Sequence, residues 1–432
     1  MNATTLHTGT LAHLRDDPFL HDDALEIIPD GALAVDPAGC IAMAGTRAEV
    51  AAAYPIARVI DHGQDWLIPG LIDAHLHFPQ FYATAAFGGE LLGWLEESIL
   101  PAEMAHADEA YAEAAAGRFV ARLLAAGTTT AMVFGSGYFP ATAALFRAAE
   151  EAGLRLIAGL TLMDRQVPEA LLHRIDEVVE DMRRLIAYCG DRPRLHYAVT
   201  PRFALSCSPE LMAACGEVLR EFPECYLQTH INESPAEIAA VRTDFPGARH
   251  YLDVYDRHGL IGPRTLLAHS IHSTGEELAR MAEASCAVCH CPSSNLYLGS
   301  GLFPLARHLA QRIPVAIGTD VGAGPQFSVW RELAEMYKVQ RLQGLGLTAA
   351  QLLYPATLGG ARALGLDGET GNFAPGKSAD FFVLGFEGDD YLSARLEHCG
   401  SDEARLFCLL HLAGPAEVRA TYAAGARAAG EG

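Results

Sequence analysis

The sequence of 432 residues predicts an α/β fold, a (β/α)8 TIM-like barrel with a small flanking β-sandwich domain built from both chain ends. Three observations support this prediction. Eight short apolar runs alternate with helix-like segments through the middle of the chain. Histidine and carboxylate residues close several of these runs, and barrels place their functional side chains at the C-terminal ends of strands. Both ends of the chain contain short runs of strand type instead.

The small domain is predicted to consist of residues 1–65 as its N-terminal part and residues 366–432 as its C-terminal part. In the first part, Gly31–Asp36 is a short alternating run bounded by turn residues, and Phe381–Gly385 has a similar strand-like character in the last part. We expect the two parts to pair into one domain.

Residues 66–365 are predicted to form the barrel. Its eight apolar runs are Leu67–Asp73, Gly127–Phe134, Arg155–Leu162, Leu195–Pro201, Cys225–His230, Thr265–His269, Cys286–Cys291 and Pro314–Asp320. Helix-like segments separate them, among them residues 108–126, 141–152, 169–188 and 274–284. An open doubly wound sheet is the alternative, but no Gly-x-Gly-x-x-Gly turn follows the first run and the candidate ligands fall at strand ends.

Composition narrows the class of protein. Half of the residues are hydrophobic, enough for a large core, and no apolar run reaches the roughly 18 residues of a membrane span. The formal net charge of -22 disfavours binding to the phosphate backbone of nucleic acids. Several early aspartates argue against a secretory signal, and ten cysteines, most of them in apolar segments, favour reduced thiols. We expect a cytoplasmic protein that binds neither nucleic acid nor membranes.

His75 and His77 stand one residue apart at the end of the first run. Side chains alternate along a strand, so both imidazoles project from the same face. His230 and Asp320 end later runs and complete a set of three nitrogens and one carboxylate, which suits Zn²⁺ and equally Fe²⁺ or Mn²⁺. Two-metal barrels bridge their ions with a carbamylated lysine on the fourth strand, but both lysines of this chain follow the eighth run. We therefore expect one metal ion per chain.

Carboxylate and imidazole groups beside these ligands are candidates for proton transfer. A bound metal brings the pKa of water near 7 and so supplies a nucleophile at neutral pH. Glu233, three residues beyond His230, can then carry protons to a substrate, and Asp320 can accept the first one. His269, which ends the next run, is placed to hydrogen-bond the water or the tetrahedral intermediate.

Other histidines and cysteines have simpler explanations. The chain contains 18 histidines, and a lone histidine is usually exposed or hydrogen-bonded in the fold; we expect this of His7, His62, His106, His250 and His308. Cys286–Cys291 superficially resembles a second zinc site. However, residues three apart in a strand face opposite sides, so a buried barrel strand is the better interpretation.

The motifs also resemble a known family. The segment Pro69–His77, with His230, His269 and Asp320, is similar to the signature of the amidohydrolase superfamily. Within it, further segments resemble the guanine deaminases: His77–Gln80, Leu92–Leu95, Pro101–Glu103, Val199–Ser208, His290–Asn295 and Gly318–Val321. The likeness extends from about Ile68 to Val383, whereas residues 1–53 match weakly.

The resemblance implies a role for each matching residue. It implies that one zinc ion is held by His75, His77, His230 and Asp320. It implies substrate contacts from Gln80, Trp94, Arg202, Phe203, His230 and Glu233. A planar guanidinium offers fixed donors to a guanine carbonyl or ring nitrogen, and a phenyl ring offers a face for packing. Asn232 departs from the family pattern, where a small polar residue is expected, and should leave Glu233 in place. A homodimer is implied as well.

The predicted function is hydrolytic deamination of guanine to xanthine and ammonia by a mononuclear zinc-activated water. This would be the activity of a metal-dependent amidohydrolase acting on C–N bonds in cyclic amidines, with Glu233, His269 and Asp320 as catalytic residues. The alternative is deamination of another aminopurine, a pterin or an s-triazine. A non-catalytic barrel is a further alternative, and a phosphoesterase is disfavoured by the single metal and the acidic charge. Residues 78–101 are expected to cover the base and exclude water.

Overall fold

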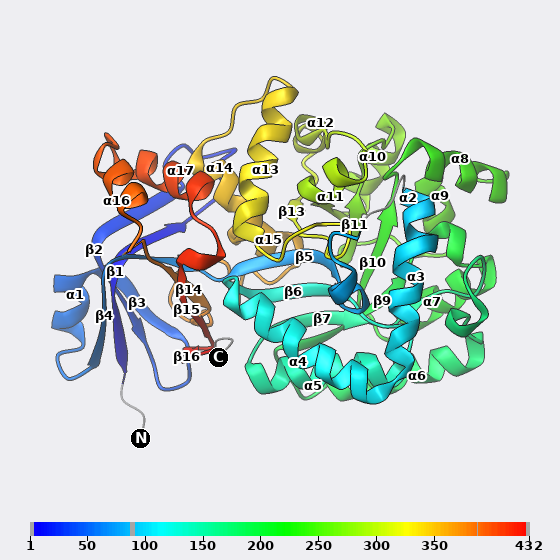
Figure 1. The fold of residues 1–432 in the computed structure, drawn as a ribbon, viewed down its shortest axis with the longest axis horizontal. Coiled ribbons are helices and arrows are strands. Elements are labelled where there is room, and N and C mark those ends of the chain that lie inside the picture. The colour runs from blue at the N-terminus through cyan, green and yellow to red at the C-terminus, as the bar shows by residue number, and fades with distance from the viewer. Residues whose placement is uncertain (1–3, 87–90, 387, 429–432) are drawn as a thin grey trace. The chain divides into compact units, whose positions relative to one another are not determined.

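The computed structural model describes residues 4–86, 91–386 and 388–428 (Figure 1). The chain divides into two compact units, one of residues 1–73, 121–130 and 328–432 and the other of residues 74–120 and 131–327. The domain boundaries expected after residues 65 and 365 stay predictions. Within the described residues, no helix is both long and apolar enough to cross a bilayer.

Eight strands form the barrel sheet in chain order (Figure 1). Their bounds are β5 (Leu71–His77), β6 (Thr128–Phe134), β7 (Arg155–Gly159), β9 (Leu195–Pro201), β10 (Tyr226–Ile231), β11 (Thr265–His269), β12 (Ala287–His290) and β13 (Val315–Ile317), and β8 (Thr161–Leu162) pairs with β9. The two ends of the sheet meet just beyond β13. There the Asp320 N–H donates to the His75 carbonyl at 2.8 Å and the His77 N–H donates to the Val321 carbonyl at 2.6 Å. The predicted barrel is confirmed.

The barrel strands are buried on both faces, as expected for a parallel sheet covered by helices. Every residue of β5, β6, β7, β11, β12 and β13 is buried. The cysteine-rich run is therefore the buried strand that was predicted, and all ten cysteines are free thiols. Gly159 is needed for close strand contact, because a Cβ at this position would lie 1.7 Å from the Ala198 carbonyl oxygen.

The first apolar run is divided between two sheets. Its residues up to Pro69 end β4 (Arg58–Pro69), whereas the barrel strand starts at Leu71 and not at Leu67 as predicted. Gly70 separates the two strands. A Cβ on Gly70 would lie 2.0 Å from Thr129 Oγ1, so the chain can pass this closely to β6 only without a side chain.

Helices connect the barrel strands. They are α2 (Leu91–Trp94), α3 (Leu100–Met104), α4 (Glu109–Ala125), α5 (Phe139–Ala152), α6 (Ile175–Cys189), α7 (Pro209–Glu221), α8 (Pro235–Asp244), α9 (Tyr251–Asp256), α10 (Gly275–Glu283), α11 (Pro292–Tyr297) and α12 (Leu305–Ala310). Thr274 caps α10, since its side chain accepts from the Glu277 N–H. The helix expected over residues 169–188 is interrupted after a short turn, where the His173 ring nitrogens lie 3.0 Å from the Met163 carbonyl and 2.8 Å from the Gly137 carbonyl.

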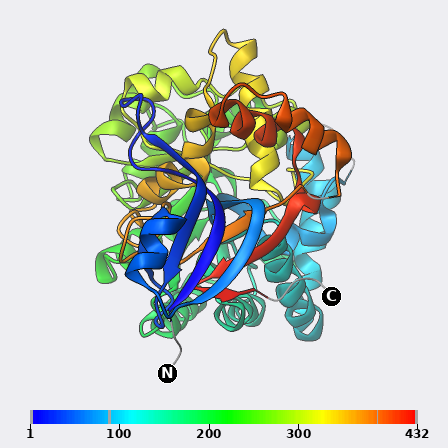
Figure 2. The same ribbon diagram turned by 90° about the vertical axis from the view of Figure 1, so that its left-hand side faces the viewer.

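Both chain ends contribute to one seven-stranded mixed sheet, which Figure 2 shows with the strands of the two ends side by side. Its order is β16 (Ala426–Arg427), β15 (Val418–Ala423), β14 (Phe381–Leu384), β4, β1 (Thr5–Leu14), β2 (Leu25–Val35) and β3 (Ile41–Thr46). Phe381 of β14 is paired with Pro69 of β4 in antiparallel register, which confirms that the two ends form one β-structure. The same unit holds α1 (Arg47–Ala53), α13 (Val329–Leu342), α14 (Ala349–Leu353), α15 (Leu358–Ala363), α16 (Asp390–Glu397) and α17 (Asp402–Leu412).

Candidate metal centre

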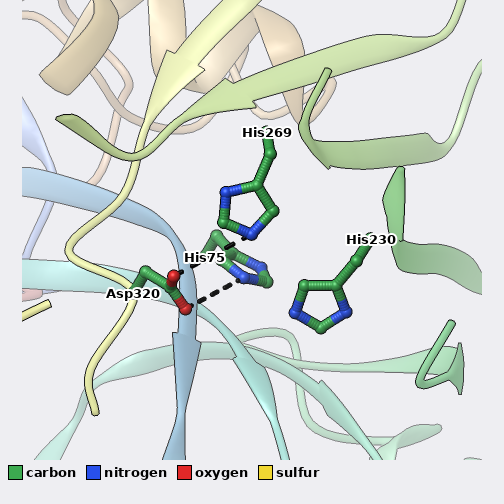
Figure 3. A group of neighbouring side chains, drawn as sticks. All are labelled: His75, His230, His269 and Asp320. Carbon is green, nitrogen blue, oxygen red and sulfur yellow. Dashed lines mark ion pairs between the residues drawn. The ribbon is translucent and has the colours of Figure 1, made fainter. Parts of the chain in front are cut away.

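Three of the four predicted ligands, His75, His230 and Asp320, lie together with His269 at the C-terminal ends of the barrel strands (Figure 3). The fourth, His77, contacts Asp320 and His230. His75 and His77 lie on β5, His230 lies on β10, His269 ends β11, and Asp320 follows β13. His269 and Asp320 have left-handed backbone conformations, with φ of 71° and 50°. Such conformations cost about 1–3 kcal/mol each and concentrate at functional sites, where the surrounding structure holds them.

The ligand atoms lie within reach of one cation. Asp320 Oδ1 is 3.3 Å from His75 Nε2 and 3.2 Å from His77 Nε2, and His77 Nε2 is 3.2 Å from His230 Nε2. One ligand atom from each of His75, His230, His269 and Asp320 lies within 4.8 Å of the others. The four ligands expected from the sequence therefore occupy one place, with His269 beside them.

Protonation states suit metal binding. Burial lowers the pKa of His77 to about 4 and that of His269 to about 3. Burial and the neighbouring imidazoles hold the pKa of His230 well below its ordinary value. Burial opposes ionisation of Asp320, but hydrogen bonding and charge attraction, chiefly from His75, hold the pKa of this carboxyl well below its usual range. These shifts favour the neutral imidazoles of His77, His230 and His269 and the carboxylate of Asp320, the forms in which such side chains bind metals.

The donor set fits a metal ion. His230 Nδ1 donates to the Arg202 carbonyl at 2.6 Å, which leaves a lone pair on Nε2, and this atom faces His77 Nε2 at 3.2 Å. Two ring nitrogens this close are satisfied by a shared cation. Three nitrogens and one carboxylate oxygen suit zinc, and the backbone contact of His230 is the kind of outer bond that orients metal ligands.

His269 differs from the other imidazoles. Its Nδ1 lies 2.9 Å from Asn295 Nδ2, so the Asn295 amide orients the ring from outside the ligand cluster. Its Nε2 is 3.5 Å from Glu233 Oε2 and 3.9 Å from Asp320 Oδ2.

Glu233 is buried beside the ligands. Its Oε1 accepts from Ser300 Oγ at 3.0 Å. Burial raises the pKa of this carboxyl well above its ordinary value, and repulsion from Glu237 and Asp320 adds to the effect. Asn232, whose φ is 50°, turns its amide away to donate to Ser273 Oγ and Glu277 Oε1, both at 3.0 Å. Glu233 therefore places a carboxyl of raised pKa next to the candidate metal ligands.

One cavity joins these groups to the residues expected to bind a substrate. Its lining includes Gln80, Trp94, Arg202 and Phe203 as well as His77, His230, Glu233, His269 and Asp320. The Trp94 indole N–H donates to the Ala86 carbonyl at 3.1 Å, so this side chain offers the cavity an apolar wall. Residues 87–90 of the segment expected to cover the base lie outside the described residues.

Comparisons with known proteins agree with this geometry. The amidohydrolase family model matches residues 66–407. The chain belongs to the amidohydrolase family. It is 44% identical to a probable guanine deaminase of Deinococcus radiodurans over 97% of both chains, and 40% identical to the guanine deaminase of Escherichia coli over 85% of this chain and 84% of that one.

Solved structures of the same family are similar throughout. The guanine deaminase of Bradyrhizobium japonicum superposes with a TM-score of 0.95 at 35% identity, covering 100% of both chains. The guanine deaminase of C. acetobutylicum, a structure with guanine bound in the active site, has a TM-score of 0.90 at 27% identity and covers 99% of this chain and 100% of its own. The present chain is thus similar to guanine deaminases over its full length.

Several polar side chains of this amidohydrolase site had no role in the sequence analysis. Ser294 Oγ donates to Asp320 Oδ2 at 2.5 Å, and Ser300 and Asn295 contact Glu233 and His269 as described above. Ser294 and Asn295 lie in the matched segment His290–Asn295, so the motif contained the signal. Ser300 lies outside every matched motif, and nothing in the sequence distinguishes it from other loop serines.

Proposed function

We propose that this chain hydrolyses guanine to xanthine and ammonia with one zinc ion per chain. The observation that carries the proposal is the buried Glu233 carboxyl, which stands between a His–Asp ligand cluster and a cavity lined by Arg202 and Gln80. A metal site alone fits many hydrolases. A proton donor aimed into a cavity with a guanidinium and an amide fits the deamination of a planar, hydrogen-bonding base.

The proposed ligands are His75, His77, His230 and Asp320. Zinc bound there would lower the pKa of water at its open position to about 7 and so supply a nucleophile at neutral pH. His269 is assigned to hydrogen bonding through its Nε2, which lies 3.5 Å from Glu233 Oε2. Its donor can hold the attacking water or the developing oxyanion at C2 of guanine.

Glu233 is assigned to proton transfer. Hydrolysis delivers one proton of water to N3 of guanine and the other to the amino group at C2, which leaves as ammonia. Asp320 accepts the first proton of the attacking water. Glu233, whose raised pKa favours its protonated form, protonates N3, and its carboxylate then carries the second proton to the leaving nitrogen. The proton held by Asp320 then passes to Glu233, so that both carboxyl groups recover their starting forms.

Arg202, Gln80 and Phe203 are assigned to the base. Guanine presents a carbonyl oxygen and ring nitrogens as acceptors, and a guanidinium provides donors in a fixed plane. The Gln80 amide both donates and accepts, and the Phe203 ring offers a surface for packing against the base. Burial of the two polar side chains strengthens their hydrogen bonds and penalises a base that leaves them unpaired.

Ammonia release from a panel of substrates tests the proposal. The zinc-loaded protein is incubated with guanine, other aminopurines, aminopterins and amino-s-triazines. Guanine should have the highest kcat/KM, and Arg202→Met should reduce that value by about 10- to 100-fold, the loss expected when a charge-assisted hydrogen bond is removed. A faster rate on another ring, or an Arg202→Met variant that treats guanine like the wild type, would refute the substrate assignment.

We also propose a homodimer, on the resemblance to the family alone, and a cytoplasmic location, on the composition alone. Light scattering coupled to gel filtration measures the first, and a mass equal to one chain would contradict it. Fractionation of the native cells tests the second.

A further inference from the structure

Glu103, on α3, lies behind two of the residues assigned to the base. Its Oε1 accepts from Gln80 Nε2 at 3.1 Å, and its two oxygens accept from Arg202 Nη1 at 2.6 and 2.7 Å. All three side chains are buried, but only Gln80 and Arg202 line the cavity. Glu103 can therefore influence a bound base only through these two neighbours.

These contacts fix the orientation of the Gln80 amide. Its Nε2 donates to the Glu103 carboxylate, and its Oε1 accepts from the Gly322 N–H at 3.2 Å. A rotated amide would place an oxygen against the carboxylate and an NH₂ group against the N–H, so both bonds would be lost. One N–H and one lone pair of Gln80 remain for a ligand, each in a defined direction.

Arg202 is fixed in the same way. Its Nη1 is bound to Glu103, whereas Nε and Nη2 have no protein acceptor among the described residues. Its carbonyl accepts from His230 Nδ1 at 2.6 Å, so the backbone beneath this side chain is tied to a proposed metal ligand. Arg202 lines the cavity, so these two contacts set the position of its guanidinium relative to the metal centre.

Glu103 also balances the charge of Arg202. The two side chains are only 2% and 4% exposed, so water screens their charges weakly. As a pair they add no net charge to the cavity wall. An unpaired Arg202 would attract an anionic purine. The Glu103–Arg202 pair has no net charge, so it gives an anionic purine no advantage over a neutral one.

We propose that Glu103 is a positioning residue for the base. It sets the donor and acceptor pattern that Gln80 and Arg202 present, and it cancels the charge of Arg202 so that a neutral purine binds in preference to an anionic one. This inference rests on the proposed function, because it takes guanine as the ligand of the cavity.

Steady-state kinetics of the zinc-loaded Glu103→Gln variant test the positioning role. The amide keeps the size of the side chain but replaces one carboxylate oxygen by an NH₂ group. That group opposes Arg202 Nη1 in either orientation of the amide, and opposes Gln80 Nε2 as well in one of them. KM for guanine should rise by about 10- to 100-fold, with a smaller change in kcat and unchanged zinc content. The matched control is Glu109→Gln, an exposed position at the start of α4 that does not line the cavity, and it should behave like the wild type.

Inhibition by product-like purines tests the charge balance. In mildly alkaline buffer xanthine is an anion and hypoxanthine is neutral. In the Glu103→Gln variant the inhibition constant of xanthine should fall about tenfold relative to that of hypoxanthine, because Arg202 then carries an uncompensated charge that attracts the anion. A variant that binds both inhibitors more weakly by the same factor would show that Glu103 acts as packing alone and would overturn the proposal.

A thermal comparison covers the case in which Glu103→Gln does not fold. The Arg202→Met variant leaves the Glu103 carboxylate buried and unpaired. The double variant Arg202→Met/Glu103→Gln should therefore have a higher Tm than Arg202→Met alone, and an equal or lower Tm would overturn the pairing. A wild-type protein inactive on guanine overturns the proposed function and this inference together. An active wild type whose Glu103→Gln variant keeps its KM and inhibitor ratio overturns this inference alone.

Discussion

Replacing Glu233 by glutamine removes the proposed proton carrier while preserving the shape of the site. The amide oxygen can still accept from Ser300 Oγ, now 3.0 Å from Glu233 Oε1. Burial and like charges raise the pKa of this carboxyl and so favour its neutral form, which the neutral amide of glutamine reproduces. The variant should therefore fold and bind its metal like the wild type.

The expected loss follows from the number of proton transfers that depend on this residue. One general acid or base contributes about 10²- to 10⁴-fold, and Glu233 is assigned both the transfer to N3 and the transfer to the leaving nitrogen. The nearest spare carboxylate cannot take over. Glu237 already accepts from the Glu233 and Ser234 N–H groups and from the Tyr251 hydroxyl at 2.7 Å. We expect kcat to fall by about 10³- to 10⁴-fold, or about 4–5.5 kcal/mol in barrier height.

The assay is xanthine formation at saturating guanine, with zinc per chain measured on the same samples by mass spectrometry. Glu276→Gln is the matched control, since Glu276 is an exposed residue on α10. A Glu233→Gln variant that holds its metal and turns over within tenfold of the wild type would refute the assignment of the shuttle.

Other substitutions test the metal ligands and the fold. Asp320→Asn should lose zinc and activity together, measured by metal analysis and ammonia release; retention of both would contradict its assignment as a ligand. Glu277→Ala should lower the unfolding free energy by about 3–5 kcal/mol in urea titration, because the carboxylate caps α10 and accepts from the Asn232 amide and the Leu252 N–H. Gly159→Ala should lower the unfolding free energy by about 1–3 kcal/mol, because the added methyl group clashes with the neighbouring strand. Gly117→Ala, at an open position on α4, should raise the same free energy by about 0.5–1 kcal/mol. Equal effects of the two substitutions in urea titration would contradict this account.

Much of the fold follows from patterns local in the sequence. The alternation of apolar runs and helical segments determines a parallel barrel, and the period of two in a strand brings His75 and His77 to one face. Because parallel strands end at one edge of the sheet, the positions of His230, His269 and Asp320 at strand ends were enough to predict one cluster. These inferences need no knowledge of how side chains pack.

What the sequence did not reveal depends on contacts between distant segments. The start of the barrel strand at Leu71 depends on how closely Gly70 passes Thr129. The break before α6 depends on His173 reaching carbonyls of two other segments. Glu103 lies within a matched motif. Its proposed role could be inferred only from its contact with Arg202, which is 99 residues away in the chain. No periodic pattern encodes such pairings.

Titration of the metal-free protein with zinc tests the central claim most directly. Guanine deamination, followed as xanthine formation against bound zinc, should rise linearly and reach its plateau at one equivalent per chain, since His75, His77, His230 and Asp320 lie close enough together to hold one cation, as proposed. Full activity without metal, or a plateau that requires two equivalents, would contradict it.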